Sequence, residues 1–160
     1  MHPSDYGKVT LWGKTSDTPR YVQSYGSDYT YTGMNHQGIA IPPSLFQLKE
    51  WLENRYGSFQ QVLLNWYENG HKYIGSHADN EPQIKKRSPI VSITLGATRK
   101  FRIRKNKTKE IVYDLDIPDR TIVVMCGKFQ EELKHEIVKV NGEKGEQVGP
   151  RINITMRQFN

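Results

Sequence analysis

Near its C-terminus the chain reads Arg151-Ile152-Asn153-Ile154-Thr155-Met156-Arg157. Polar and apolar residues alternate throughout this stretch, which is the period-2 pattern of a β-strand with one apolar and one polar face. Arg151 and Arg157 share the polar face with an asparagine and a threonine. That face is either solvated or turned into the mouth of a barrel, where the planar fork of an arginine suits an anionic carboxylate.

Other strand-like runs precede this one. We predict strands over 62–67, 88–96, 99–105, 111–115, 121–125 and 136–140, with the C-terminal strand over 152–159. Within 99–105, Phe101 and Ile103 lie on one face and cations on the other. Loops that contain Gly, Pro, Asn or Asp separate most of these runs, as is typical of all-β folds.

A single helix is predicted ahead of the strands. Ser44 follows Pro42-Pro43 as a good N-cap, and Gly57 supplies the end. The apolar residues at helical spacing between them are Leu45, Leu48, Trp51 and Leu52. Many short strands after one helix indicate a mainly β (α+β) fold, a sandwich or jelly roll with the helix packed outside.

Length and composition restrict the class of protein. A chain of 160 residues that is 36% hydrophobic fits one domain with a real core. Cys126 is the only cysteine, which excludes an intramolecular disulfide and a cysteine-based zinc site. There is no run that could span a bilayer and no secretory signal, so we expect an intracellular protein, nuclear or cytoplasmic, that contacts no membrane. A formal net charge of +6 favours a polyanionic partner.

The first 40 residues differ from the rest in composition. They are rich in Tyr, Ser, Gly, Thr and Asp and carry few aliphatic side chains. This composition predicts an irregular, aromatic surface segment. The alternative is a poorly ordered N-terminal arm.

Two histidines and one carboxylate form a candidate metal site. His77 and Asp79 are two positions apart, so on a strand both side chains point to the same side, and His135 follows later in the chain. Two His and one carboxylate are the ligand set of a facial triad, which leaves positions open and suits Fe(II). The alternative is that each histidine is an ordinary exposed or hydrogen-bonded strand residue. Asn65 and Tyr67 share one face of their own run in the same way.

In their order and spacing, these motifs resemble the AlkB family of Fe(II)/2-oxoglutarate dioxygenases over nearly the whole chain. The matching motifs are Asn-x-Tyr at 65–67, His-x-Asp at 77–79, the later His135, and Arg-x-Asn-x-Thr-x-Arg at 151–157 after a Gly-Pro pair. Residues 11–14, 19–20, 25–26 and 29–33 resemble the nucleotide-recognition lid of the animal members that repair double-stranded DNA. The resemblance implies a double-stranded β-helix (jelly roll) in a single domain over 1–160. About 1–40 would form the lid, and about 41–160 the buttressing helix and catalytic core.

The resemblance also implies cofactors and chemistry. His77, Asp79 and His135 would hold Fe(II), with 2-oxoglutarate and O2 as cosubstrates. The cosubstrate pocket would be formed by Asn65, Tyr67, Arg151, Asn153 and Arg157. The implied activity is oxidative demethylation of 1-methyladenine and 3-methylcytosine in DNA, and by extension RNA, with release of formaldehyde, succinate and CO2.

Substrate contacts are implied for the lid and the metal site. A cationic methylated base would stack on Tyr31, with the His77 ring on its other face, and Glu81 would read the exocyclic amino group. Trp12 occupies the position of an aromatic finger that, in these family members, fills the gap left by the flipped base. The alternative is that Trp12 simply packs under the lid. The remaining substrate contacts are Arg20 and Tyr29.

A basic run lies downstream of the metal motif. Residues 99–109 carry seven cations, with Lys85-Lys86-Arg87 nearby. They form either a solvated strand face or a phosphate-contacting ridge, and the candidates for phosphate contact are Arg99, Lys100, Arg102, Arg104 and Lys105. The segment 141–147 is nearly neutral where the double-strand-repairing members carry a short basic run. The preference for single or double strands is therefore not decided by the resemblance.

Three functions agree with these residues. The first is a monomeric nucleic-acid demethylase of the AlkB type. The second is an Fe(II)/2-oxoglutarate hydroxylase that acts on RNA, another modified base or a protein. The third is a non-catalytic jelly-roll module that binds nucleic acid. The lid aromatics and the basic run favour nucleic acid over protein, and the intact triad argues against the non-catalytic module.

Overall fold

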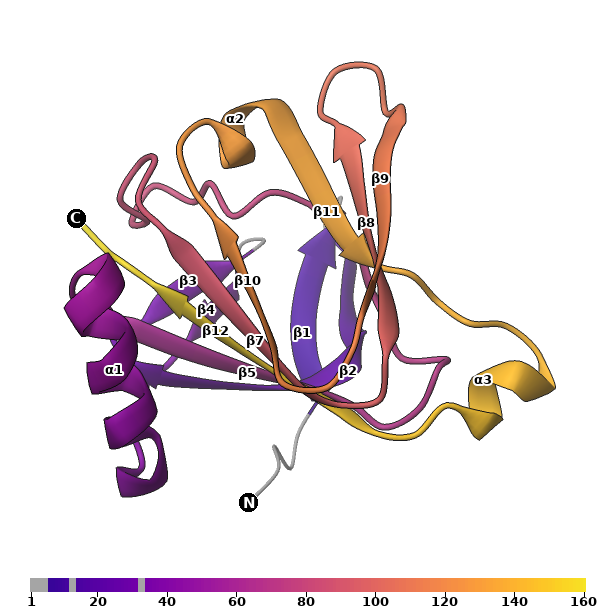
Figure 1. Cartoon of the computed structure of the whole chain (residues 1–160), viewed down its shortest axis with the longest axis horizontal. Helices are drawn as coiled ribbons and strands as arrows, with labels where there is room; N and C mark the ends of the chain where they lie inside the picture. The colour runs from indigo at the N-terminus through magenta and orange to yellow at the C-terminus, as the bar shows by residue number, and fades with distance from the viewer. Residues whose placement is uncertain (1–5, 12–13, 32–33) are drawn as a thin grey trace.

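Two antiparallel sheets face each other in the computed structural model, which describes residues 6–11, 14–31 and 34–160 (Figure 1). The larger sheet has the strand order β1-β2-β5-β12-β7-β10 and the smaller one β6-β11-β8-β9, while β3 and β4 form a separate hairpin. The helix α1 covers the outer side of the larger sheet. The predicted jelly roll with an external helix is confirmed.

The element bounds are as follows. The larger sheet contains β1 (Tyr6–Leu11), β2 (Lys14–Gly26), β5 (Gln61–Tyr67), β7 (Ile90–Gly96), β10 (Thr121–Met125) and β12 (Arg151–Arg157). The smaller sheet contains β6 (Ile74–His77), β8 (Arg99–Lys105), β9 (Ile111–Ile117) and β11 (Leu133–Ile137). The hairpin consists of β3 (Tyr29–Tyr31) and β4 (Met34–His36). The helices are η1 (Pro43–Leu45), α1 (Phe46–Tyr56), α2 (Phe129–Glu132) and α3 (Glu143–Gln147).

The alternation along β12 determines the layers of the protein. This strand lies inside the larger sheet, between β5 and β7. Its apolar residues, such as Ile154 and Met156, pack with Leu52 of α1 in one hydrophobic cluster. Its polar residues point the other way, into the space between the sheets, where Arg151 is 2% and Arg157 is 4% exposed. The polar face is therefore an interior wall, and the solvated alternative is wrong.

A second hydrophobic cluster fills part of the space between the sheets. Phe101 and Ile103 of β8 contribute to it, together with Tyr67, Met125 and Ile137 from three other strands. This confirms the predicted inward face of 99–105. No helix in the described part of the chain is long and apolar enough to cross a membrane.

The structure corrects two details of the predicted helix. Ser44 does not cap it, because a short 3₁₀ turn precedes α1 and the N-cap of α1 is Leu45, which makes no side-chain cap hydrogen bond. Trp51 was expected on the packed face but is 51% exposed. Gly57 ends the helix as predicted, with a φ of 88° that favours glycine and an N–H that donates to Glu53 O.

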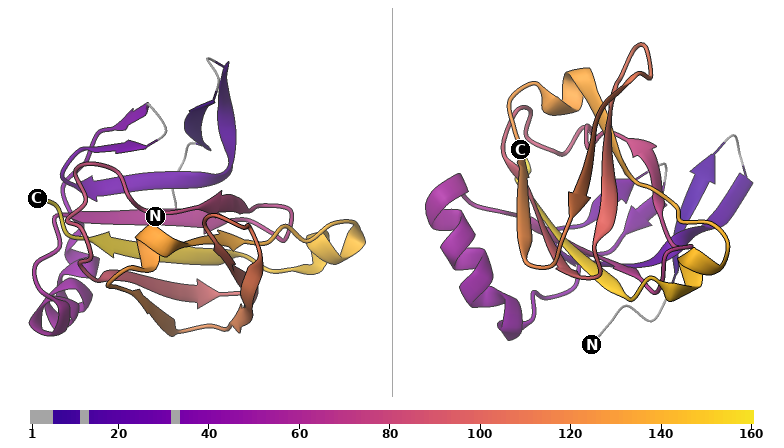
Figure 2. Two further views of the ribbon diagram at one scale, coloured as in Figure 1. Left: turned by 90° about the horizontal axis from the view of Figure 1, so that it is seen from above. Right: turned by 45° about the vertical axis from the view of Figure 1, so that its right-hand side comes forward.

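The N-terminal 40 residues are more regular than their composition predicts. The strand β2 pairs with β5 in the larger sheet, and β1 pairs with β2. The hairpins β1–β2 and β3–β4 project from the same side of the molecule (Figure 2). Pairing with a strand that is already part of a sheet compensates for the weak local pattern, and the Tyr, Thr and Val of β2 suit a strand.

Candidate metal and cosubstrate site

Adjacent strands of the smaller sheet bring the two histidines together. His77 ends β6 and His135 lies on β11, directly opposite in the antiparallel register, with 4.3 Å between the ring centroids. Asp79 lies in the loop after β6, so the strand ends at His77 and does not continue through the His-x-Asp motif. One ligand atom from each of the three residues lies within 4.8 Å of the others. The structure therefore assembles the predicted ligand set.

Each imidazole is held in the neutral form that binds a metal. His77 Nδ1 lies 2.8 Å from Gly75 O, so the proton belongs on Nδ1 and the lone pair of Nε2 faces Asp79. Burial lowers the pKa of His77, and it lowers the pKa of His135 to about 3. Neither ring needs to lose a proton before it binds a cation near pH 7.

Arg157 holds the Asp79 carboxylate in place. Its Nη2 donates to Asp79 Oδ1 at 3.0 Å, and its Nη1 donates to Gln61 Oε1 at 2.9 Å. Burial opposes ionisation of Asp79, but the Arg157 charge and its hydrogen bond outweigh it and hold the pKa of this carboxyl well below its usual range. Asp79 is thus anionic as well as fixed.

Unpaired buried atoms show that this cluster fits a cation. Asp79 Oδ2 and His135 Nδ1 are buried and have no hydrogen-bond partner among the described residues. An unsatisfied buried polar atom costs about 1–3 kcal/mol, so native proteins seldom leave two together without a ligand. A metal ion with open coordination positions would satisfy the cluster.

Arg151 presents a partly unpaired guanidinium to the same space. Its Nη2 donates to Thr94 Oγ1 at 2.8 Å, and its guanidinium carbon lies 5.1 Å from the centre of the Tyr67 ring. Its Nε and Nη1 atoms are buried and lack partners in the described part of the chain. A buried cation with unused donors is suited to an anion such as a carboxylate.

One cavity, which we call the inner cavity, joins the metal cluster to Arg151. Its lining includes all of the predicted metal and cosubstrate residues, which are His77, Asp79, His135, Asn65, Tyr67, Arg151, Asn153 and Arg157. Asn65 accepts a hydrogen bond from Arg20 Nε at 2.7 Å, and Asn153 donates to Ser92 Oγ at 2.7 Å. These two amides therefore brace the wall of the cavity.

Sequence reasoning missed several polar residues that support this site. Gln61 orients Arg157, Thr94 accepts from Arg151, and Gln130 Oε1 accepts from the Asp79 amide at 2.9 Å. Gln61 has the same strand parity as Asn65, and Thr94 interrupts an apolar run. Strand parity could have indicated these two, whereas Gln130 belongs to a short helix that carries no local signal for the site.

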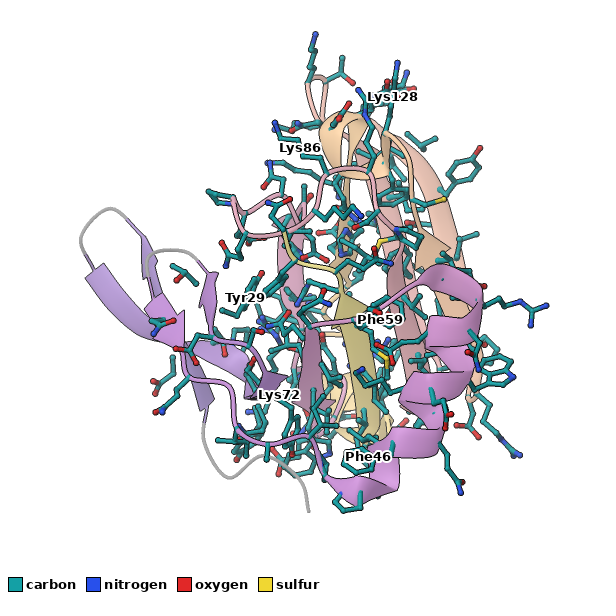
Figure 3. The ribbon with its side chains drawn as sticks, turned by 90° about the vertical axis from the view of Figure 1, so that its left-hand side faces the viewer. Tyr29, Phe46, Phe59, Lys72, Lys86 and Lys128 are labelled. Carbon is teal, nitrogen blue, oxygen red and sulfur yellow. The ribbon has the colours of Figure 1, made fainter. Side chains whose placement is uncertain are left out.

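Arg20 and Tyr29 lie deeper than an exposed lid would place them. Arg20 is 5% and Tyr29 is 2% exposed, and both line the inner cavity. The Tyr29 ring stacks on Phe159 at 6.2 Å, and the guanidinium of Arg157 lies 5.0 Å from its centre. Tyr29 is seen in Figure 3 between the N-terminal hairpins and the barrel. Both side chains therefore lie beside the metal ligands.

The other predicted substrate contacts fall into two groups. Glu81 follows Asp79 in the loop after β6, and burial, reinforced by the Asp79 charge, raises the pKa of its carboxyl. Trp12 and the side chain of Tyr31 lie outside the residues that the structure describes. Their predicted roles stay predictions.

The prediction that Arg99 contacts phosphate is wrong. Arg99 is 2% exposed, and its guanidinium donates four hydrogen bonds to backbone carbonyls. The acceptors are Asn69, Gly70, Lys72 and Val138. Arg99 shares the inward face of Phe101, so it ties β8 to the neighbouring loops instead of meeting solvent.

The other four candidates for phosphate contact are paired with acids. The pairs are Lys100–Asp116 at 3.0 Å, Arg102–Asp114 at 2.7 Å, Arg104–Glu136 at 2.9 Å and Lys105–Glu110 at 2.8 Å. Lys100, Arg102 and Arg104 alternate with the inward Phe101 and Ile103, so they project from the outer face of the smaller sheet. Phosphate contact by these residues stays a prediction. Their acidic partners already offset much of their positive charge.

Comparison with known proteins agrees with this geometry. Residues 7–157 match the family model described as the 2OG-Fe(II) oxygenase superfamily. The chain is 31% identical over 154 residues to "Alpha-ketoglutarate-dependent dioxygenase alkB homolog 3" of Bos taurus, covering 89% of this chain and 52% of that protein. It is 26% identical over 163 residues to "DNA oxidative demethylase ALKBH2" of Homo sapiens, covering 95% and 61%. The chain thus spans between about half and three-fifths of the length of these relatives.

A solved structure shares the fold. OsALKBH1 superposes with a TM-score of 0.58 at 19% identity, over 99% of this chain and 84% of that one. At this identity the likeness concerns the overall architecture alone.

Proposed function

Because the chain belongs to the 2OG-Fe(II) oxygenase superfamily, we propose that it is an Fe(II)- and 2-oxoglutarate-dependent dioxygenase that demethylates N-methylated bases in nucleic acid. One observation carries the proposal. The inner cavity joins a His77–Asp79–His135 cluster, which has unpaired buried ligand atoms, to the buried and partly unpaired guanidinium of Arg151. A cation site and an anion site in one cavity are what this pair of cosubstrates requires.

Each residue has a definite task in this scheme. His77, Asp79 and His135 would hold Fe(II), and Arg151 would bind the distal carboxylate of 2-oxoglutarate. Arg157 keeps Asp79 ionised and oriented. When bound, the iron would supply the oxidising chemistry: one atom of O2 enters the N-methyl group, the other enters succinate, and CO2 leaves 2-oxoglutarate. The hydroxymethylated nitrogen then releases formaldehyde and leaves the unmodified base.

Charge and position favour a methylated base as the substrate. The bases 1-methyladenine and 3-methylcytosine are cationic near neutral pH. Glu81 comes two residues after the metal ligand Asp79 and lies beside the inner cavity, where an anionic side chain would offset a positive base. A base must leave its stack to enter such a cavity. The human relative is named a DNA oxidative demethylase, which supports DNA as one substrate polymer.

A product assay tests the proposal. Purified protein with Fe(II), 2-oxoglutarate and an oligonucleotide bearing 3-methylcytosine should release formaldehyde and succinate in equal amounts. Single-stranded DNA, duplex DNA and RNA that carry the same lesion would be compared, with unmethylated strands as controls. A protein that binds neither iron nor 2-oxoglutarate would show that the enzyme assignment is wrong. Succinate without formaldehyde on every strand would favour a hydroxylase with another substrate.

A further inference from the structure

A second cavity lies beside the inner cavity, and the proposed chemistry does not use it. Its volume is about 380 Å³, within the range of pockets that hold small molecules or parts of larger ones. Its walls are the loop 79–90 and the segment 127–131, which leads into α2. Asp79 contributes to both cavities. We call this second cavity the outer groove.

The lining of the outer groove carries charges of both signs. Asp79 joins the groove to the metal cluster, and the other charged lining residues are Glu81, Lys85, Lys86, Arg87 and Glu131. Arg87 is committed to Glu131, with Nε–Oε1 at 2.8 Å and Nη2–Oε2 at 3.1 Å. Lys85 and Lys86 are exposed, and neither forms an ion pair with any residue the structure describes.

The loop that carries these lysines is held firmly at the backbone. Lys85 N donates to Gln158 O at 2.8 Å, and Gly127 N donates to Arg87 O at 3.2 Å. Ser88 Oγ donates to Lys85 O at 2.7 Å, and this hydrogen bond closes a turn that contains both lysines. The two ammonium groups therefore reach solvent from a backbone that is already ordered, so a ligand need not order it on binding.

The cations around the outer groove differ in how far acids offset them. Lys86 and Lys128 lie at the same end of the molecule in Figure 3, and Lys128 is 3.8 Å from Glu132. The basic run on β8 differs, because its cations are paired with acids on the outer face of the smaller sheet. Unpaired lysines beside the metal cluster are better placed to attract a polyanion than paired cations on an outer face.

We propose that the outer groove binds a phosphodiester group of the strand that carries the target base, through Lys85 and Lys86. This inference rests on the proposed function and deepens it. A base and its phosphate are joined through one sugar, so the phosphate site must adjoin the base site. A groove that shares Asp79 with the inner cavity meets this requirement, and the ammonium groups of Lys85 and Lys86 match an anionic phosphate.

The test removes the two charges without reversing them. Lys85→Gln/Lys86→Gln is compared with wild type and with Lys139→Gln/Lys144→Gln, which removes the same charge from exposed positions elsewhere. Binding of a fluorescein-labelled single strand that contains 3-methylcytosine is followed by anisotropy across a salt series. Loss of one phosphate contact, shared by the two lysines, should reduce the slope of log K against log salt by about 0.7, which is about a 5-fold loss of affinity at roughly 0.1 M salt.

The outcomes separate this inference from the proposed function. A salt slope equal to that of wild type, or an equal loss in the Lys139/Lys144 control, would overturn the groove as a phosphate site. Turnover of the free nucleoside 3-methylcytidine, which lacks phosphate, should be unchanged by Lys85→Gln/Lys86→Gln, and an equal loss there would also overturn it. A wild-type protein that demethylates no substrate contradicts the proposed function, while strand binding still reports on the groove.

Discussion

Replacement of Arg151 by methionine should separate ligand binding from folding. In the unliganded protein, this guanidinium makes one hydrogen bond to Thr94 and contacts the Tyr67 ring, while Nε and Nη1 stay buried without partners in the described structure. Arg99 is also a buried arginine on the interior, but it donates four hydrogen bonds to carbonyls. Arg99→Met is therefore the matched control.

The expected magnitudes follow from these contacts. In Arg151→Met, loss of the Thr94 hydrogen bond lowers the free energy of unfolding by about 1 kcal/mol, and loss of the Tyr67 ring contact lowers it by about 1–2 kcal/mol. Removal of each unsatisfied buried donor raises it by about 1–3 kcal/mol. The free energy of unfolding should thus stay within about 2 kcal/mol of wild type. Two lost charged hydrogen bonds to 2-oxoglutarate, at about 1.5–3 kcal/mol each, should weaken its binding by about 10²–10⁴-fold. Arg99→Met should cost about 3–5 kcal/mol of stability and leave 2-oxoglutarate binding unchanged.

Thermal unfolding with and without 2-oxoglutarate, with Mn(II) as a stand-in for iron, measures both quantities. Wild type and Arg99→Met should show a ligand-dependent rise in Tm, and Arg151→Met should show none. Arg99→Met should melt about 10 °C lower than wild type, because 1 kcal/mol shifts a protein of this size by about 2–4 °C. If Arg151→Met lost as much stability as Arg99→Met and still responded to 2-oxoglutarate, Arg151 would be a structural residue.

Three further perturbations have defined outcomes. Asp79→Ala should abolish metal binding and turnover, and should cost about 3–5 kcal/mol of stability because Arg157 loses its buried partner; metal titration and denaturant unfolding check both effects. Glu81→Gln should raise the free energy of unfolding at neutral pH. The pKa of Glu81 is higher in the folded protein than in the unfolded chain, so wild type loses stability as the pH rises above the pKa of the unfolded chain. Thermal melts at a series of pH values should show that the gain vanishes below about pH 4.5. Tyr31→Ala should weaken turnover of the methylated base while substrate-free 2-oxoglutarate decarboxylation persists, and equal loss of both would make Tyr31 structural.

The sequence predicted strands best where the period-2 pattern was complete. The bounds of β8 agree with the predicted 99–105, because polar and apolar residues alternate along that run. The bounds of β10 also agree with the predicted 121–125, where the signal is a short apolar run. The strand β6 was missed, since Ile74-Gly75-Ser76-His77 has one aliphatic residue and a glycine, and it forms by pairing with β11. Trp51 follows the helical spacing but lies outside the narrow face that α1 buries against the sheet.

The sequence predicted the ligand residues of the candidate site better than the residues that hydrogen-bond to them. The order of the motifs led to His77, Asp79, His135 and Arg151, and the structure brings all four to one cavity. Gln130 was not predicted, because it reaches Asp79 across a long stretch of chain. Hydrogen-bond partners of this kind depend on which distant segments pack together, and no local pattern records them.

By itself, the sequence determined the faces of each strand and the ligand types that the chain can offer. A period of two separates polar from apolar side chains, but it does not say which face meets the core. Only the tertiary structure decided that the polar face of β12 is interior, because α1 covers the apolar face on the other side. It also decided that the Arg99 guanidinium donates four hydrogen bonds to carbonyls while Arg151 keeps both Nε and Nη1 unpaired among the described residues. The physical reason is that burial and hydrogen bonding depend on which distant segments pack together. Two chemically identical side chains, Arg99 and Arg151, therefore take different roles, one structural and one suited to binding an anion.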